Sequence, residues 1–301
     1  MLLSSVLQFG QLKAERTCDM EFVTLNSGLI RVRISDFGAE MHSILDRDGE
    51  ERLWQGDPKF WANRAPIMFP VCGGLKEDAY LLNGKRYPMQ KHGFARKLPW
   101  KLVYSDETIA RYELTHQEEG FPFEYAMFAE YSVSGSTITV RYEVENRDGE
   151  VFYCGLGSHE AYRTFGGLEQ CSIAFERPET LKRFILHGNL LADEYEIMGE
   201  NVSCLPLKTE YFAVDALVFP YLKSREATLA SNVSDKRIRV RYDGMDVLML
   251  WTKPGADYVC IEPWTNAPDF ESCDMNIEHK PGMIRLAPGA NAVRRHFIEV
   301  I

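Results

Sequence analysis

Apolar and polar residues alternate with a period of two through much of this chain. Between residues 136 and 146, every second side chain from Ile138 to Val144 is apolar, and the residues between them are charged or carry hydroxyls. Residues 237–242 and 30–34 repeat the pattern. Alternation of this kind is typical of half-buried antiparallel strands.

Turn signals separate the strand-like runs, and helical periodicity is hard to find. The turn dipeptides are Asp48-Gly49, Asn83-Gly84, Asp148-Gly149 and Asp243-Gly244. No Pro/Gly/Ser linker, low-complexity stretch or short-period repeat divides the sequence, and an α/β fold would need alternating helical segments. We therefore predict one all-β domain over residues 1–301, built as a large antiparallel β-sandwich.

Composition and charge narrow the possible partners. The 301 residues are 45% hydrophobic and 26% charged, which is normal for a globular protein with a substantial core. The net charge of -10 and the lack of a basic run argue against nucleic acid and anionic membranes as partners. No segment is long and apolar enough to span a membrane.

Cysteine usage and the N-terminus suggest a compartment. The seven cysteines are an odd number without a C-x-x-C pair, which argues against a disulfide framework and a structural zinc site. Residues 1–7 are mildly apolar but lack the basic start and the sustained apolar stretch of a signal peptide. We expect a cytoplasmic protein with reduced thiols.

Residues 258–264 are mostly apolar but include one carboxylate, Glu262. As a strand, this segment places Val259 and Ile261 on one face and Cys260 and Glu262 on the other. Because burying an unpaired charge is costly, the carboxylate must be paired, hydrogen-bonded or functional. If the aliphatic face packs on a core, Glu262 points into a cleft, where it can act as a general base.

Two arginines offer a structural alternative, in which Glu262 is a buried residue paired with Arg64 or Arg96. Arg64 precedes an apolar run that ends in paired glycines, so its guanidinium can donate to ligand hydroxyls or carboxylates. It can equally form a surface salt bridge. An arginine partner does not exclude a functional role for Glu262.

Two histidines lie in suggestive contexts. His92 is followed by Gly93 in a predicted loop, where it is either a site residue or a histidine satisfied by backbone groups. On an extended chain Gly155, Gly157 and His159 share a face, so two missing side chains would leave room for a ligand beside the imidazole. The alternative is that the glycines mark a bulge or a tight strand crossing.

No motif in the sequence requires a cofactor or a metal. A P-loop, a G-x-G-x-x-G after a strand, H-E-x-x-H and G-x-S-x-G are all missing. We therefore predict a protein that works without a cofactor and without a bound metal.

Taken together, four segments in order resemble the aldose 1-epimerase (galactose mutarotase) superfamily, and within it the LacX-like branch. They are residues 64–73, 91–100, 157–161 and 260–264. The early Phe37-Gly38-Ala39 turn and residues 215–219 extend the likeness, so that order and rough spacing match across nearly the whole chain.

The resemblance implies a galactose mutarotase-like supersandwich, a large antiparallel β-sandwich with an open concave cleft. It also implies an isomerase that interconverts the α and β anomers of aldoses without a cofactor. By position, Glu262 matches the catalytic base, His159 the catalytic acid and His92 a second site histidine. Where typical mutarotases carry Asn-His, this chain has Ser158-His159.

The resemblance also suggests how a small-molecule sugar would be held. Arg64 and Asp215 match sugar-contacting positions. Arg96 could serve a hydroxyl or a phosphate, and Trp264 could stack on the apolar face of a sugar ring. We also expect a neighbouring carboxylate to help keep the imidazole of His159 charged.

Three functions remain open on the sequence. The first is a mutarotase acting on a free aldohexose, with acid and base opening the ring. The second is the same chemistry on a hexose 6-phosphate. The third is a carbohydrate-binding or sensing protein that has lost catalysis. Both a monomer and a homodimer are compatible with the sequence.

Overall fold

The computed structural model describes residues 20–301. The expectation about a signal peptide at residues 1–7, and the first part of the predicted domain, lie outside this range. Within it the regular structure consists of β-strands and four short 3₁₀ turns, and no α-helix occurs. The all-β prediction is therefore confirmed. No helix in this range is long and apolar enough to cross a membrane.

The strands follow one another closely along the chain. The first eleven are β1 (Phe22–Asn26), β2 (Arg31–Ser35), β3 (Met41–Leu45), β4 (Ile67–Met68), β5 (Ala79–Leu82), β6 (Lys85–Pro88), β7 (Lys101–Ser105), β8 (Ile109–Leu114), β9 (Tyr125–Ser134), β10 (Thr137–Asn146) and β11 (Phe152–Cys154). The rest are β12 (Gly157–Ser158), β13 (Glu160–Arg163), β14 (Cys171–His187), β15 (Leu190–Pro206), β16 (Leu217–Phe219), β17 (Glu226–Ser231), β18 (Arg237–Asp243), β19 (Val247–Trp251), β20 (Tyr258–Trp264), β21 (Ile284–Leu286) and β22 (Asn291–Val300). The 3₁₀ turns are η1 (Lys76–Asp78), η2 (Ala95–Lys97), η3 (Leu168–Gln170) and η4 (Thr209–Phe212).

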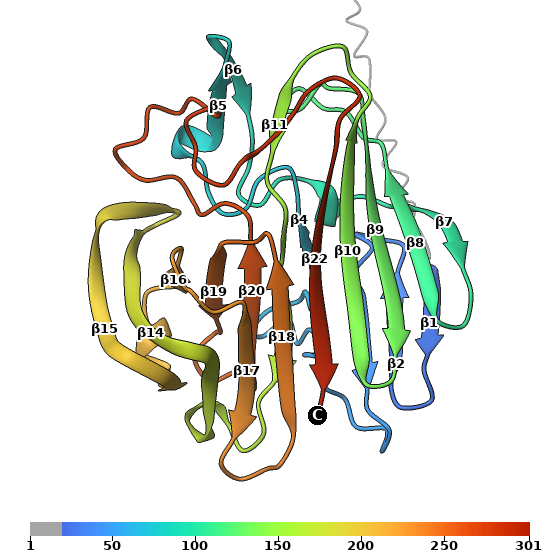
Figure 1. Ribbon diagram of the computed structural model, residues 1–301, viewed down its shortest axis with the longest axis vertical. Helices are drawn as coiled ribbons and strands as arrows, with labels where there is room; N and C mark the ends of the chain where they lie inside the picture. The colour runs from blue at the N-terminus through green and yellow to red at the C-terminus, as the bar shows by residue number, and fades with distance from the viewer. Residues whose placement is uncertain (1–19) are drawn as a thin grey trace, which may run out of the picture.

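Fifteen strands form one continuous antiparallel sheet that bends over on itself (Figure 1). Its path runs β4-β12-β20-β19-β16-β14-β17-β18-β22-β10-β9-β8-β7, with β13 beside β20 and β15 beside β14. The bend lies at the long strand β14, whose residues 171–175 pair with β17 while Phe184 pairs with β16. The strands from β4 to β16 thus form one layer and those from β17 to β7 the other.

The hydrophobic core lies between these two layers. Val259 and Ile261 of β20 belong to the same buried cluster as Val240 of β18 and Ile138 of β10. All four side chains are fully buried. The faces predicted from alternation in residues 136–146 and 237–242 are therefore confirmed. The opposite face of β20 does not contribute to this core.

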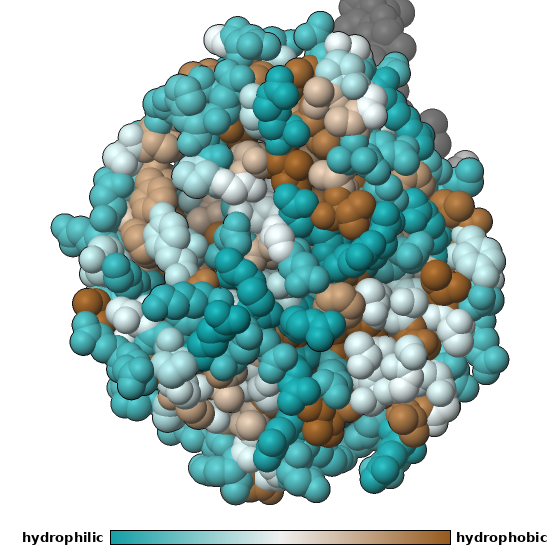
Figure 2. All heavy atoms as spheres, in the orientation of Figure 1, coloured by the Kyte–Doolittle hydropathy of each residue, from teal (hydrophilic) through white to brown (hydrophobic). Residues whose placement is uncertain are grey.

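Smaller sheets complete the molecule. They are β1-β2-β3, β5-β6 and β11-β21. The β5-β6 hairpin turns at Asn83 and Gly84, both at positive φ, as the Asn-Gly signal predicts. Figure 2 shows that hydrophilic residues cover most of the outer face of the front layer, with apolar residues in small groups.

Candidate active site

Glu262 lies on the face of β20 that points away from the core. Tyr258 and Cys260 share this face and belong to a separate buried cluster, as the alternation predicts. The neighbouring strand β19 places Met249 directly opposite Glu262. Both residues line a cavity of about 430 Å³ on the outer side of the layer. The carboxylate is only 1% exposed, so it lies at the base of this cavity.

His159 meets Glu262 in the same cavity. It occupies the one-residue break between β12 and β13, both of which pair with β20. Its Nε2 lies 3.3 Å from Oε2 of Glu262. Neither Arg64 nor Arg96 forms an ion pair with Glu262 within residues 20–301, so the proposed arginine pairing is wrong.

Burial sets the protonation of this pair. Burial raises the pKa of Glu262 well above its usual value. The nearby positive charge of Lys91 lowers this pKa, but by less than burial raises it. Burial, reinforced by the nearby cations Arg96 and Lys91, lowers the pKa of His159 to about 3. The expectation that a carboxylate keeps this imidazole charged is therefore wrong, because desolvation outweighs the attraction. Burial therefore favours a protonated Glu262 and a neutral His159.

His92 lies beside the pair with a fixed tautomer. Its Nδ1 accepts a hydrogen bond from the backbone N–H of Gly73 at 3.1 Å, so Nε2 carries the proton of the neutral ring. Burial and the proximity of His159 hold its pKa well below the usual value. The ring lines the cavity and packs edge-on against His159 and Trp264. Backbone bonding therefore satisfies one nitrogen and leaves the other as a donor.

Charged side chains surround the cavity. Arg96 of η2 donates to the carbonyl of Lys91 at 3.1 Å and forms no ion pair among the described residues. The Nζ of Lys91 lies 3.9 Å from Oδ2 of Asp215, which follows η4. Lys253 also lines the cavity. Arg96 and Asp215, both expected at the site, are thus placed there.

Arg64 is placed elsewhere. Its guanidinium donates to the carbonyl of Gln55 at 2.8 Å, and its backbone N–H donates to the carboxylate of Glu40. It is not among the residues that line the cavity. Of the expected site residues, Arg64 is the one that the structure does not bring to the others.

The glycines before His159 serve packing. A Cβ on Gly157 would lie 2.5 Å from Cδ1 of Trp264, and one on Gly155 would lie 1.9 Å from Oδ1 of Asn266. The expectation that they leave room for a ligand is therefore wrong, because protein side chains fill that space. Trp264 itself is buried, donates from Nε1 to the carbonyl of Ser158 and lines the cavity.

Two tryptophans and a lysine were missed in the sequence. Trp61 stacks on His159 with ring centroids 4.8 Å apart, and Trp251 packs edge-on against it at 5.5 Å. Trp251 and Lys91 line the same cavity. Trp251 lies opposite Cys260 in the β19-β20 pairing. This position places Trp251 on the site face, but it can be recognised only when the register of the two strands is known. Trp61 comes from a loop, and nothing in its local sequence marks it.

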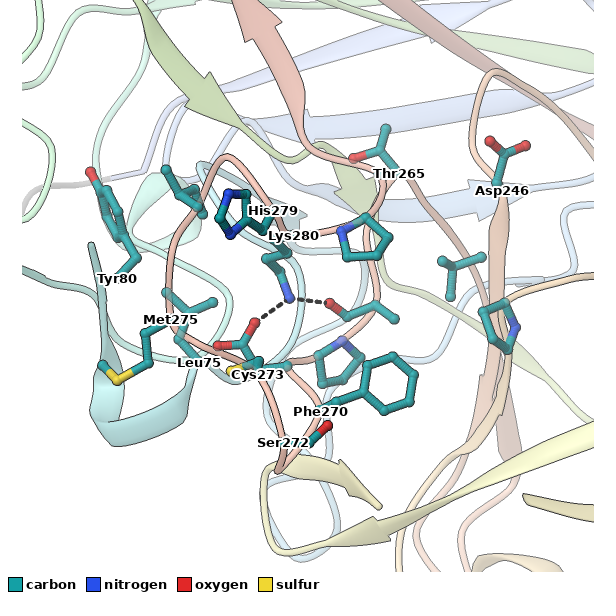
Figure 3. Close-up of a pocket in the computed structure, with 18 of the residues that line it drawn as sticks. Leu75, Tyr80, Asp246, Thr265, Phe270, Ser272, Cys273, Met275, His279 and Lys280 are labelled. Carbon is teal, nitrogen blue, oxygen red and sulfur yellow. Dashed lines mark hydrogen bonds and ion pairs between the residues drawn. The ribbon is translucent and has the colours of Figure 1, made fainter. Parts of the chain in front are cut away.

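A larger cavity of about 940 Å³ lies between the loop of residues 265–282 and the ends of neighbouring strands. Its charged groups are occupied with one another. Lys280 donates to a carboxylate oxygen of Asp269 and to the carbonyl of Ala267, as the dashed lines in Figure 3 show. Asp274 and His279 also face each other in this cavity, with Oδ2 and Nδ1 2.6 Å apart, but both side chains are more than half exposed. His159 and Glu262 are buried, so the smaller cavity around Glu262 is the candidate active site.

Known proteins resemble this chain over nearly its full described length. The family model described as aldose 1-epimerase matches residues 21–294. The plasmid-borne protein LacX of Lactococcus lactis subsp. lactis is 28% identical over 303 residues, covering 93% of this chain and 99% of LacX.

Solved structures show the same likeness. A galactose mutarotase related enzyme from Lactobacillus acidophilus superposes with a TM-score of 0.87 at 27% identity, covering 93% of this chain and 97% of that one. A galactose mutarotase-like protein from Lactobacillus casei gives 0.87 at 26% identity, covering 93% and 100%. These likenesses extend to the predicted galactose mutarotase-like sandwich, which is confirmed.

Proposed function

The chain belongs to the aldose 1-epimerase family, and from this premise we propose that it is a mutarotase that interconverts the α and β anomers of a free aldohexose. The observation that carries the proposal is the facing pair of His159 and Glu262, 3.3 Å apart in a cavity. An imidazole and a carboxylate can exchange protons with the two oxygens on C1 of a sugar.

Ring opening uses both members of the pair. Glu262, as the carboxylate, takes the proton of the C1 hydroxyl, and protonated His159 gives a proton to the ring oxygen. The bond between C1 and the ring oxygen breaks, which leaves an aldehyde and a new hydroxyl. Rotation about the C1–C2 bond and reclosure on the other face return both protons.

The pKa directions fit this cycle. After ring opening, Glu262 is protonated and His159 is neutral, which is the form that burial favours. The reactive form differs from it only by the transfer of one proton between groups 3.3 Å apart. The pair therefore needs no net gain or loss of protons during turnover.

The surrounding side chains supply binding. The Nε2–H of His92 is a donor for a sugar hydroxyl, and Asp215 is an acceptor at the rim. Trp251 presents an aromatic surface to the cavity, on which the apolar face of a sugar ring can pack. We retain Trp264 as a binding residue and give Arg64 no direct contact, because it lies outside the cavity lining.

A phosphorylated aldose is the second candidate substrate. The observation in its favour is the guanidinium of Arg96, which lines the cavity without a carboxylate partner among the described residues. Lys91 and Lys253 add positive charge to the same cavity. An arginine suits bidentate binding of a phosphate.

The function is tested by measuring anomer exchange with NMR or polarimetry on glucose, galactose and related aldoses. Glu262→Gln and His159→Gln should each lower kcat about 10²–10⁴-fold, the usual worth of a positioned acid or base. Glu210→Gln, at an exposed carboxylate, is the control. An unchanged rate in Glu262→Gln would show that the base is wrongly assigned.

The alternatives give different results in the same assay. Preference for a hexose 6-phosphate, with Arg96→Gln raising KM for that substrate alone, would favour the second candidate. Indifference to the phosphate would exclude it. Calorimetry showing tight sugar binding without acceleration of anomer exchange would favour a carbohydrate-binding or sensing protein.

The proposed setting is the cytoplasm, with a small-molecule sugar as the partner. Support comes from the six cysteines of the described range, all free, and from the net charge of -10. Whether the protein acts as a monomer or a homodimer stays a prediction for sedimentation to decide.

A further inference from the structure

Cys260 adjoins the candidate active site without lining its cavity, and the proposed reaction does not use it. It precedes Glu262 by two positions on β20, lies on the same face and is fully buried. The ligand atoms of His159, Cys260 and Glu262 all lie within 4.8 Å of one another. An imidazole, a thiol and a carboxylate thus converge on one point.

Two of the three side chains also have unused bonding capacity. Both carboxylate oxygens of Glu262 and the Nδ1 of His159 are buried without a hydrogen-bond partner among residues 20–301. Buried polar atoms normally have partners, so each such atom requires an explanation. The unpartnered carboxylate oxygens of Glu262 offer lone pairs beside the imidazole and the thiol, which suits a ligand that accepts lone pairs.

We propose that His159, Cys260 and Glu262 form a binding site for a zinc-like divalent cation, and that this ion is an inhibitor rather than a cofactor. Zinc bonds of about 2.0–2.3 Å to nitrogen, oxygen and sulfur imply ligand separations of about 3.3–3.7 Å in a tetrahedral site. The three ligand atoms need to approach one another by only about 1 Å. The mixed donor set suits Zn²⁺ or Co²⁺ and disfavours Mg²⁺ and Ca²⁺.

Binding of a divalent cation to this buried site releases two protons, so the net charge of the site stays the same. Cys260 binds as a thiolate, so its thiol proton leaves to the solvent. The one proton that His159 and Glu262 share leaves as well. One dication thus replaces two protons, and the net charge of the site does not change. His159 and Glu262 line the cavity, so a water that enters it can take the fourth coordination position.

Inhibition follows from the identity of the ligands. The ion occupies the lone pairs with which His159 and Glu262 would accept protons, so it should exclude reaction and compete with the sugar. This consequence depends on the proposed mutarotase function. Binding of the ion does not, because it is measured without a substrate.

The test adds Co²⁺ and Zn²⁺ to the metal-free full-length protein. Co²⁺ should produce a thiolate-to-cobalt charge-transfer band, and calorimetry should give one strong Zn²⁺ site per chain. Cys260→Ala should abolish the band and weaken Zn²⁺ binding by more than about 100-fold, beyond the 10–100-fold cost of losing an outer-shell partner. Cys260→Ser is a second variant in case the first does not fold.

Matched controls separate this site from other thiols. Cys154→Ala removes an equally buried thiol that lies in the main core. Cys204→Ser removes an exposed one. Both should keep the band and the affinity. Loss of the band in Cys204→Ser with its retention in Cys260→Ala would assign binding to a surface thiol and overturn the proposal, as would the absence of any band.

Activity measurements distinguish a failure of the metal-site proposal from a failure of the proposed mutarotase function. Active protein whose anomer exchange is indifferent to Zn²⁺, at concentrations that saturate one site, would overturn the inhibitory role and leave the mutarotase intact. A Cys260-dependent band in a protein that never accelerates anomer exchange would support the metal site and overturn the mutarotase.

Discussion

The single proton held by His159 and Glu262 decides at which pH the proposed site works. Below a pH of about 3 both groups are protonated, because the pKa of His159 is lowered to that value, and no base remains. Above the raised pKa of Glu262 both groups have lost their protons, and no acid remains. Between these limits the pair always holds one proton.

We therefore expect kcat/KM for anomer exchange to form a plateau between these two limits. It should fall near pH 3 and again where the pH passes the raised pKa of Glu262, after subtraction of the buffer-catalysed rate. Circular dichroism at each pH checks that the chain stays folded. A profile that bends near 6.5, the ordinary pKa of histidine, would contradict this account of the site.

Glu262 should also weaken the fold as the pH rises. Its pKa is raised in the folded protein, so the folded chain keeps the proton longer than the unfolded chain. Stability is then lost as the pH rises from about 4.5, the usual value, through the folded pKa. Glu262→Gln removes this loss and should melt at a higher temperature than the wild type at pH 8.

The difference in Tm should shrink towards zero at pH 4, as differential scanning fluorimetry can measure. Glu210→Gln, at an exposed position, should show no such dependence on pH. A constant difference at both pH values would mean that Glu262 is not desolvated as its burial implies.

Individual residues of the site were predictable to different degrees. Glu262 could be found because a carboxylate in an apolar strand is an anomaly that alternation assigns to one face. Trp61 could not, because its contact with His159 joins segments about a hundred residues apart in the sequence. The role of Gly157 was wrongly inferred, since the sequence does not reveal which neighbour fills the space beside a glycine.

Strand pairing positions the catalytic groups at the scale of elements. β12 is two residues long and lies between β4 and β20, with Gly157 opposite Trp264. This close approach fixes where His159 emerges from the strand. The strands themselves were predictable from alternation, but the pairings that bring β12 beside β20 are long-range and have no local signal.

Gly157→Ala tests this approach. The added Cβ would lie 2.5 Å from Cδ1 of Trp264 and 2.8 Å from Sγ of Cys72, so the strands must move apart. We expect a loss of about 1–3 kcal/mol in the free energy of unfolding, as is typical of overpacking, and lower activity. Urea denaturation measures the first effect.

The matched control is Gly149→Ala. A Cβ at this turn position meets nothing within 4 Å, so stability and activity should both stay near the wild-type values. Equal effects of the two substitutions would show that the packing against Trp264 is not what makes Gly157 necessary.

At the scale of the whole molecule, a buried polar pair joins the two layers of the sandwich directly behind the site. His296 of β22 and Glu160 of β13 are almost fully buried, with Nε2 and Oε1 2.9 Å apart. Glu160 follows His159, and its side chain points into the core because it lies opposite Ile261. Consecutive residues thus serve the site on one face and the contact between layers on the other.

Breaking this pair should be far more costly than breaking a surface pair on the same strand. His296→Ala leaves the carboxylate of Glu160 buried without its partner, which should lower the free energy of unfolding by about 3–5 kcal/mol. Glu299→Ala removes a partly exposed ion pair with Arg239 and should cost less than about 1 kcal/mol. Urea denaturation of the two variants provides the comparison.

The double variant Glu160→Leu with His296→Leu tests whether the polar contact itself, or only the packing of these two side chains, stabilises the fold. Apolar replacement of a buried pair is often neutral, so much of the stability lost in His296→Ala should return. Anomer exchange should still be lower than in the wild type, because the position of His159 depends on the anchorage of Glu160 in the core. If the double variant is as unstable as His296→Ala, then lost packing, and not the unpaired carboxylate of Glu160, accounts for the lower free energy of unfolding.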